Sequence, residues 1–113
     1  MFCLINTQQG PFLVVSVHFK PFEKGYTARK QELGEIVDFL ESITNKVDSG
    51  SELRGENEIL LFREAIKNNN IIILGDFNYN LPFETNEIYR QGFIDLWHEL
   101  KPSEEKGYTY DPL

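Results

Sequence analysis

Two polar side chains that could handle a phosphate follow the most apolar run of this sequence. Residues 71–74 are Ile-Ile-Ile-Leu, and Gly75, Asp76 and Asn78 come directly after them. Four aliphatic residues in a row, most of them β-branched, predict a strand buried on both faces. In an extended segment, side chains two residues apart point the same way, so Asp76 and Asn78 would share one pocket. The alternative is an Asx-turn, with both side chains bonded to local backbone.

A second polar pair, Ser16 and His18, closes another strand candidate, Phe12–Phe19. The strand-helix-strand order favours two adjacent strands of one α/β sheet, parallel if the usual crossover applies. Their polar ends would then share one edge of the sheet, with His18 near Asp76 and Asn78. A lone histidine after an apolar strand is more often a packing or capping residue, but the Ser-Val-His context favours a catalytic interpretation.

Four short motifs in order resemble a known family. They are Ser-Val-His at 16–18, Gly-Asp-Phe-Asn at 75–78, Asp-Leu-Trp at 95–97 and Tyr-Thr-Tyr-Asp at 108–111. Together they resemble the endonuclease/exonuclease/phosphatase superfamily of metal-dependent phosphodiesterases, most closely its 5′-tyrosyl-DNA phosphodiesterase branch. The resemblance covers about Phe12 to Asp111 and implies hydrolysis of 5′-phosphotyrosyl DNA ends or related nucleic-acid phosphodiesters.

The resemblance also implies roles for individual residues. Asp76 would orient or deprotonate the attacking water, with an outer-shell metal contact as a further role. Asn78 would bond the phosphate, and His18 would stabilise developing charge. Ser16 and Thr109 would contact the substrate, and Tyr110 would stack on a base.

The implied cofactor is Mg²⁺, with Mn²⁺ as an alternative, because oxygen ligands and retained water suit these ions. In the family the metal is held chiefly by a Glu from an early strand pair. That strand pair and the closing Ser-Asp-His segment have no counterpart in residues 1–113. The expectation is a single partial domain over residues 1–113: the central to C-terminal portion of a layered sandwich of β-sheets flanked by helices.

The intervening elements are predicted from periodicity. Apolar residues at helical spacing predict a helix from Ala28 to about Val47 that covers the sheet, and a second from Glu58 to Lys67. Three asparagines at 68–70 end the second helix. We expect residues 48–70 (loop plus helix) to be an insertion away from the chemistry. Arg29 matches a family position and is expected to be structural.

Composition limits the alternatives. The formal net charge of −7 argues against a nucleic-acid coat protein but not against an enzyme that reaches phosphate through a cation. No apolar run is long enough to span a membrane and no signal peptide is visible, so an intracellular, nuclear or cytoplasmic protein is expected. The single cysteine, Cys3, is expected to be a core residue. Oligomeric state is not defined by the sequence.

Two other functions are compatible with these motifs. One is a different chemistry of the same superfamily, of the sphingomyelinase or inositol phosphate type. The other is a non-catalytic truncated remnant, which the missing Glu and Ser-Asp-His motifs favour.

Overall fold

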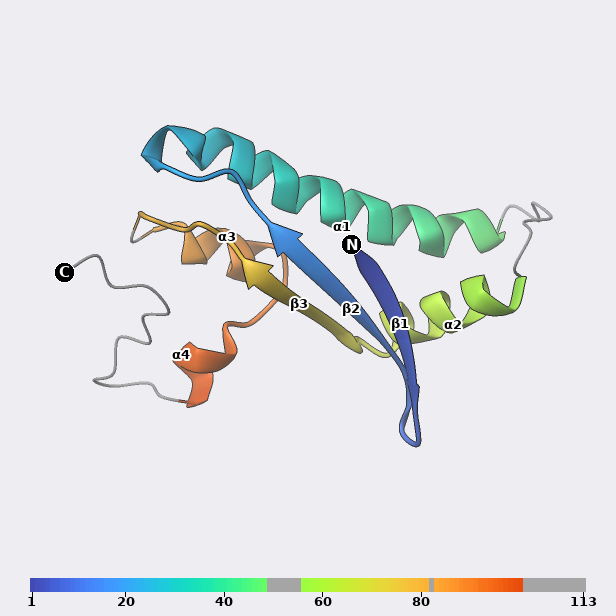
Figure 1. Ribbon diagram of the computed structural model, residues 1–113. Helices are drawn as coiled ribbons and strands as arrows, with labels where there is room; N and C mark the ends of the chain where they lie inside the picture. The colour runs from blue at the N-terminus through green and yellow to red at the C-terminus, as the bar shows by residue number, and fades with distance from the viewer. Residues whose placement is uncertain (49–55, 82, 101–113) are drawn as a thin grey trace. The chain divides into compact units, whose positions relative to one another are not determined.

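The computed structural model describes residues 1–48, 56–81 and 83–100. Within these ranges three strands form one mixed sheet in the order β1-β2-β3 (Figure 1). β1 (Phe2–Thr7) pairs antiparallel with β2 (Gly10–His18), and β2 pairs parallel with β3 (Ile71–Asp76). The expected α/β class is confirmed at this level, as is the parallel pairing of the two strands that carry the polar motifs.

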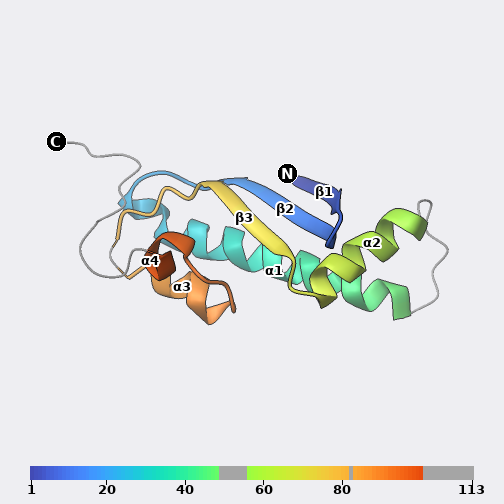
Figure 2. The ribbon, with the colours of Figure 1, turned by 90° about the horizontal axis from the view of Figure 1, so that it is seen from below.

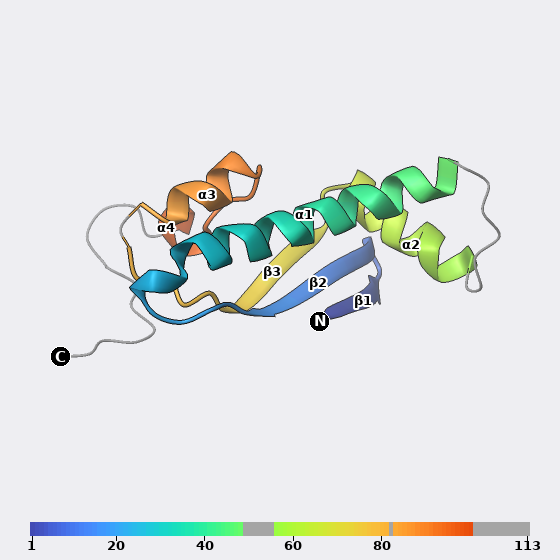
Figure 3. The same ribbon diagram turned by 90° about the horizontal axis from the view of Figure 1, so that it is seen from above.

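The helices between β2 and β3 lie on one face of the sheet (Figures 2 and 3). A short 3₁₀ helix, η1 (Glu23–Gly25), leads into α1 (Tyr26–Asp48), and α2 (Glu56–Lys67) follows. Both α-helices were expected, and each begins two residues earlier than the periodicity indicated. Asn69 ends the second with a φ of 56°, a left-handed conformation that asparagine tolerates well.

The core lies between the sheet and these two helices. Side chains alternate between the two faces of a strand, so every second residue of β2 points toward the helices. The buried apolar side chains of these elements are Leu13, Val15 and Val17 from β2, Leu33 and Leu40 from α1, and Ala65 from α2. This inner face fixes the register of the strands, because a slip by one residue would expose it.

The opposite face of the sheet, here called the outer face, is apolar but exposed. It carries Cys3 and Ile5 from β1, Val14, Ser16 and His18 from β2, and Ile72, Leu74 and Asp76 from β3. Ile72 and Leu74 are 41% and 47% exposed, so the prediction that this strand is buried on both faces was wrong. Cys3 is exposed as well, so its prediction as a core residue was also wrong. In the described residues, β3 is an edge strand covered by helices on one side only.

β1 was not predicted from the sequence. It pairs with β2 through a tight turn, in which Gly10 has a φ of 110°. Such a φ suits glycine because a Cβ would make it strained.

A second compact unit begins at Leu81. It contains α3 (Thr85–Arg90) and α4 (Leu96–Leu100). Asp95 Oδ1 accepts hydrogen bonds from the backbone N–H groups of Trp97 and His98, at 3.0 and 3.3 Å, and so caps α4. Among the described helices of both units, none has the length and apolarity needed to cross a bilayer.

Candidate active site

The parallel pairing of β2 and β3 brings the two predicted catalytic side chains together. His18 and Asp76 are direct partners in the register, at the last residue of each strand. The imidazole Nε2 lies 3.8 Å from Asp76 Oδ2, and the side chains are 77% and 63% exposed. An ion pair this exposed contributes little to stability. The expected convergence is therefore present for His18 and Asp76, and both side chains are exposed.

Gly75 allows this close approach of the strands. Its φ is 132°, and a Cβ built there would lie 2.1 Å from the carbonyl oxygen of Val17. No side chain fits at this position without a shift of the β2 backbone. The lack of space for a side chain therefore explains why glycine precedes Asp76, whatever the chemistry of the site.

An Asx-turn orients the carboxylate of Asp76. Its Oδ1 accepts a hydrogen bond from the backbone N–H of Asn78 at 3.0 Å. Asn78 has a φ of 50°, so the chain is not extended here, and the prediction that both side chains point the same way was wrong. The Asx-turn alternative is observed for Asp76, whereas the side chain of Asn78 bonds to a distant backbone carbonyl, that of Phe19. The turn fixes one carboxylate oxygen of Asp76 and leaves the other facing His18.

The side chain of Asn78 joins the ends of the two strands. Its Nδ2 donates to the carbonyl oxygen of Phe19 at 2.7 Å, and the N–H of Phe19 donates to the carbonyl of Asp76 at 2.9 Å. One of the two Nδ2 hydrogens is therefore used by the protein itself. The contact of Asn78 with phosphate stays a prediction, and its observed role is to position the residue after His18.

The segment after His18 is held by two residues of α1. Arg29, with none of its surface exposed, donates through one guanidinium nitrogen to the carbonyls of Lys20 and Phe22, at 2.9 and 2.5 Å. Glu32 Oε2 accepts from the N–H of Lys20 at 3.1 Å. Arg29 is thus structural, as expected. The role of Glu32 was not predicted, because a residue type at one helix position does not reveal a backbone partner in a preceding loop.

Phe22 was also missed by the sequence reasoning. Its φ and ψ are 69° and 158°, a region that is almost restricted to glycine. A non-glycine residue there costs on the order of 1–3 kcal/mol. The nearby Pro21 and Gly25 are turn residues and could have indicated an irregular loop at this point.

Aromatic packing supports the base of the site. Phe19 is buried, and its ring meets that of Phe77 edge to face, with centroids 5.4 Å apart. Tyr79 contacts both rings, at centroid distances of 6.4 and 5.5 Å. This cluster links the segments that follow β2 and β3.

The other predicted substrate residues are placed in part. Ser16 is exposed on the outer face, two residues before His18, so the two side chains lie on the same side of the sheet. Thr109 and Tyr110 lie outside the described residues.

Asp76 is the carboxylate that this edge of the sheet offers to a magnesium ion. Mg²⁺ requires near-octahedral oxygen coordination, and this edge of the sheet supplies one carboxylate. Among the described residues there is no group of three or more His, Cys, Asp or Glu side chains that could hold a metal. The exposed carboxylate of Asp76 could contact such an ion directly or through water, with water and substrate phosphate completing the coordination.

Comparisons of the chain with protein-family models, with curated proteins and with solved structures find no match.

Proposed function

We propose that this chain is part of a metal-dependent phosphodiesterase of the endonuclease/exonuclease/phosphatase type. The favoured substrates are 5′-phosphotyrosyl DNA ends or related nucleic-acid phosphodiesters. The observation that carries the proposal is the exposed His18–Asp76 pair, 3.8 Å apart at the shared end of two parallel strands. Ligands of α/β proteins commonly bind at this end of the strands.

The outer face of the sheet supports the layered sandwich that the proposal includes. Aliphatic side chains such as Ile72 and Leu74 are exposed on the face opposite the helices. A second sheet would pack against such a face at a spacing of about 10 Å. The polar residues His18 and Asp76 would then lie at the rim of the sandwich, beside the apolar layer.

The two side chains provide complementary chemistry for hydrolysis. Water attacks phosphorus, the new P–O bond forms and the P–O bond to the tyrosyl oxygen breaks. Asp76 Oδ2 accepts a proton from the attacking water, because Oδ1 is engaged by the Asx-turn. His18 donates a hydrogen bond to a non-bridging oxygen and stabilises its developing charge, and the departing phenolate oxygen takes its proton from solvent. The products are a 5′-phosphate and tyrosine.

Asp76 would contribute to holding the metal, directly or through water. Mg²⁺, or Mn²⁺ in its place, would neutralise charge on the phosphate when bound.

The proposal is tested by incubating the chain with Mg²⁺ and a 5′-phosphotyrosyl oligonucleotide, beside the same oligonucleotide with plain phosphodiesters only. We expect release of tyrosine, and a fall of about 100-fold or more in the rate for Asp76→Asn or His18→Gln. Asp38→Asn, a change at an exposed carboxylate of α1, is the matched control and should retain the wild-type rate.

Two outcomes would contradict it: no turnover of any phosphodiester by the wild type, or equal turnover by wild type and Asp76→Asn. The first outcome would favour the second candidate, a non-catalytic protein. The specific observation behind that candidate is the single carboxylate that the described residues place beside His18.

A further inference from the structure

Phe22, which follows the candidate active-site residue His18 closely in the sequence, has an exposed aromatic side chain. Phe22 is 77% exposed, although it lies only four residues after His18 in a loop held by the buried Arg29 and the half-buried Glu32. An exposed phenyl ring gains nothing from burial in the folded protein. Its backbone conformation is one that glycine would adopt without strain. Neither side-chain packing nor the backbone conformation therefore explains why this residue is a phenylalanine.

The backbone beneath the ring is held in place. The carbonyl of Phe22 accepts from Arg29 at 2.5 Å and from the N–H of Gly25 at 2.9 Å. Lys20, two residues earlier, is bonded through its carbonyl to Arg29 and through its N–H to Glu32. Little conformational freedom of this loop remains to be lost when a ligand binds, which lowers the entropic cost of a contact.

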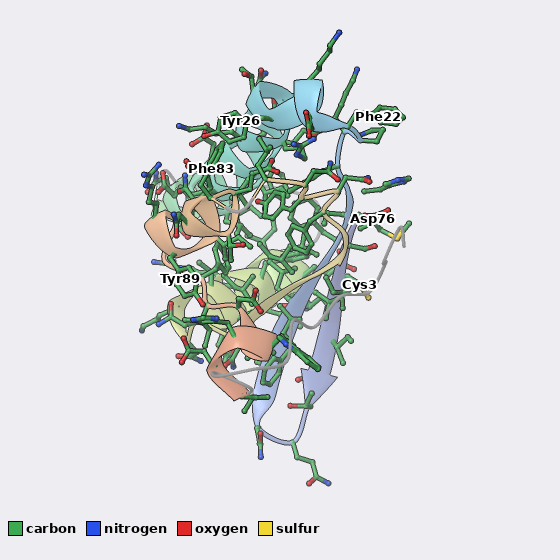
Figure 4. All side chains as sticks on the ribbon, turned by 90° about the vertical axis from the view of Figure 1, so that its left-hand side faces the viewer. Cys3, Phe22, Tyr26, Asp76, Phe83 and Tyr89 are labelled. Carbon is green, nitrogen blue, oxygen red and sulfur yellow. The ribbon has the colours of Figure 1, made fainter. Side chains whose placement is uncertain are left out.

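The ring also projects on the side where the catalytic pair is exposed. Figure 4 shows Phe22, Asp76 and Cys3 pointing to one side of the first unit, and Tyr26 to the other. This is the side of the outer face, to which Asp76 and its strand partner His18 belong. A phosphodiester at the His18–Asp76 pair would therefore lie on the side of the unit that carries Phe22, which follows His18 by four residues.

We propose that Phe22 is a substrate-binding residue, on which a planar aromatic ring attached to the scissile phosphodiester stacks. This inference rests on the proposed function. The ring can come from either side of the phosphate: the terminal nucleobase or the tyrosyl group. Base–aromatic stacking tolerates any sequence because every base has a π-face, so the contact adds affinity without base readout. It also provides attraction that does not depend on charge, which suits a chain of net charge −7.

The test measures dissociation constants by fluorescence anisotropy in Asp76→Asn chains, so that turnover does not interfere. The probe is a labelled 5′-phosphotyrosyl oligothymidylate. Two further probes each lack one ring: one has an abasic terminal nucleotide, and the other has a plain 5′-phosphate. We expect Phe22→Ala to weaken binding of the full probe by about 5- to 150-fold. The Asp76→Asn chain without a further change is the parent in these comparisons. Phe22→Tyr in that chain should bind the full probe with the affinity of the parent, because an aromatic ring is retained.

Two comparisons separate a ligand contact from a structural role. Phe22→Gly should raise the midpoint of urea unfolding by relieving the backbone, yet bind as weakly as Phe22→Ala. The probe whose affinity no longer changes with Phe22→Ala identifies the stacked ring as nucleobase or tyrosyl.

Equal affinity of the parent and Phe22→Ala for the full probe would overturn the inference and leave the proposed function standing. Failure of the parent, of wild type and of every variant to bind any of the probes would overturn both. Weaker binding that is shared by Phe22→Tyr would show that the loop, and not the aromatic ring, is the determinant, and would also overturn the inference.

Discussion

At the scale of single residues, the site is organised by two side chains with different partners. Asp76 uses one carboxylate oxygen to close an Asx-turn and turns the other toward His18. Asn78 uses its amide to bind the carbonyl of Phe19, and so ties the residue after His18 to the end of β3. The distance between the His18 imidazole and the Asp76 carboxylate therefore depends on the side-chain amide of Asn78, which contacts neither group directly.

The first prediction concerns this amide. Asn78→Ala removes the bond to Phe19 and places alanine, which tolerates the left-handed region less well than asparagine, at a φ of 50°, so both effects destabilise the fold. We expect a loss of about 1.5–3 kcal/mol in the free energy of urea unfolding. Asn78→Gly removes the same hydrogen bond, but glycine adopts a positive φ without strain. Its free energy of unfolding should therefore fall by about 1 kcal/mol less than that of Asn78→Ala. Equal losses in the two variants would show that the left-handed conformation is not retained in solution.

At the scale of the elements, the site depends on how closely β2 and β3 approach at their ends. Gly75 lies where a Cβ would meet the backbone of Val17, and its φ is 132°. In the register of these strands, Val17 pairs with Gly75, and the next pair is His18 with Asp76. A change in backbone contact at this point would therefore alter the spacing of the adjacent His18–Asp76 pair.

Gly75→Ala should destabilise the chain by more than about 2 kcal/mol, because steric conflict and an unfavourable φ add. The matched control is Gly34→Ala in α1, where no atom lies within 4 Å of the added Cβ. Alanine is the better helix former there, so this variant should gain about 0.5–1 kcal/mol. Thermal unfolding of both variants checks the pair, and equal effects would contradict the geometry at Gly75.

The hold of α1 on the loop after β2 is testable separately. Glu32→Ala removes the acceptor for the N–H of Lys20, 3.1 Å away, whereas Glu32→Gln keeps an oxygen in the same place. We expect amide hydrogen exchange at Lys20 to accelerate in the alanine variant and not in the glutamine variant. The unfolding free energies should differ by about 0.5–1.5 kcal/mol. Glu35→Ala, one turn along the same helix, should leave exchange at Lys20 unchanged.

Much of this element-level arrangement could be predicted from the sequence. Helical periodicity over residues 28–47 and the apolar runs before His18 and Asp76 were sufficient for α1, β2 and β3, and the crossover rule predicted their parallel pairing. β1 was missed because the segment 2–7 is short and has no strict alternation, and because the turn to β2 has no Asn-Gly or Asp-Gly signal.

The details of the site were less accessible to sequence reasoning. An apolar run such as 71–74 is typical of a central strand, and nothing local shows that one of its faces is exposed. The side chain of Asn78 bonds to Phe19, 59 residues away in the sequence, and the carbonyl of Phe22 bonds to a helix residue, Arg29, that follows it by seven positions. Neither bond can be predicted from a local sequence pattern.

At the scale of the whole molecule, charge and exposed apolar surface have to be reconciled with the proposed substrate. The chain is acidic, with a formal net charge of −7, and a nucleic acid is a polyanion. Long-range electrostatics therefore oppose binding, and affinity must come from a cation at the phosphate and from short-range contacts such as stacking. Because salt screens this repulsion, raising the salt concentration should not cause the steep loss of affinity that is typical of a protein that uses a basic face.

The exposed outer face leads to a last prediction, on association. Apolar side chains on an uncovered sheet favour contact with other apolar surfaces, so we expect concentration-dependent self-association in sedimentation velocity. The double change Ile72→Thr and Leu74→Thr should reduce it while keeping good strand formers, with a change of about 1 kcal/mol or less in unfolding free energy. Ile73→Thr, on the inner face, should instead destabilise the fold without reducing association. A wild-type chain that stays monomeric at high concentration would contradict the prediction, and would indicate that this face is covered in solution.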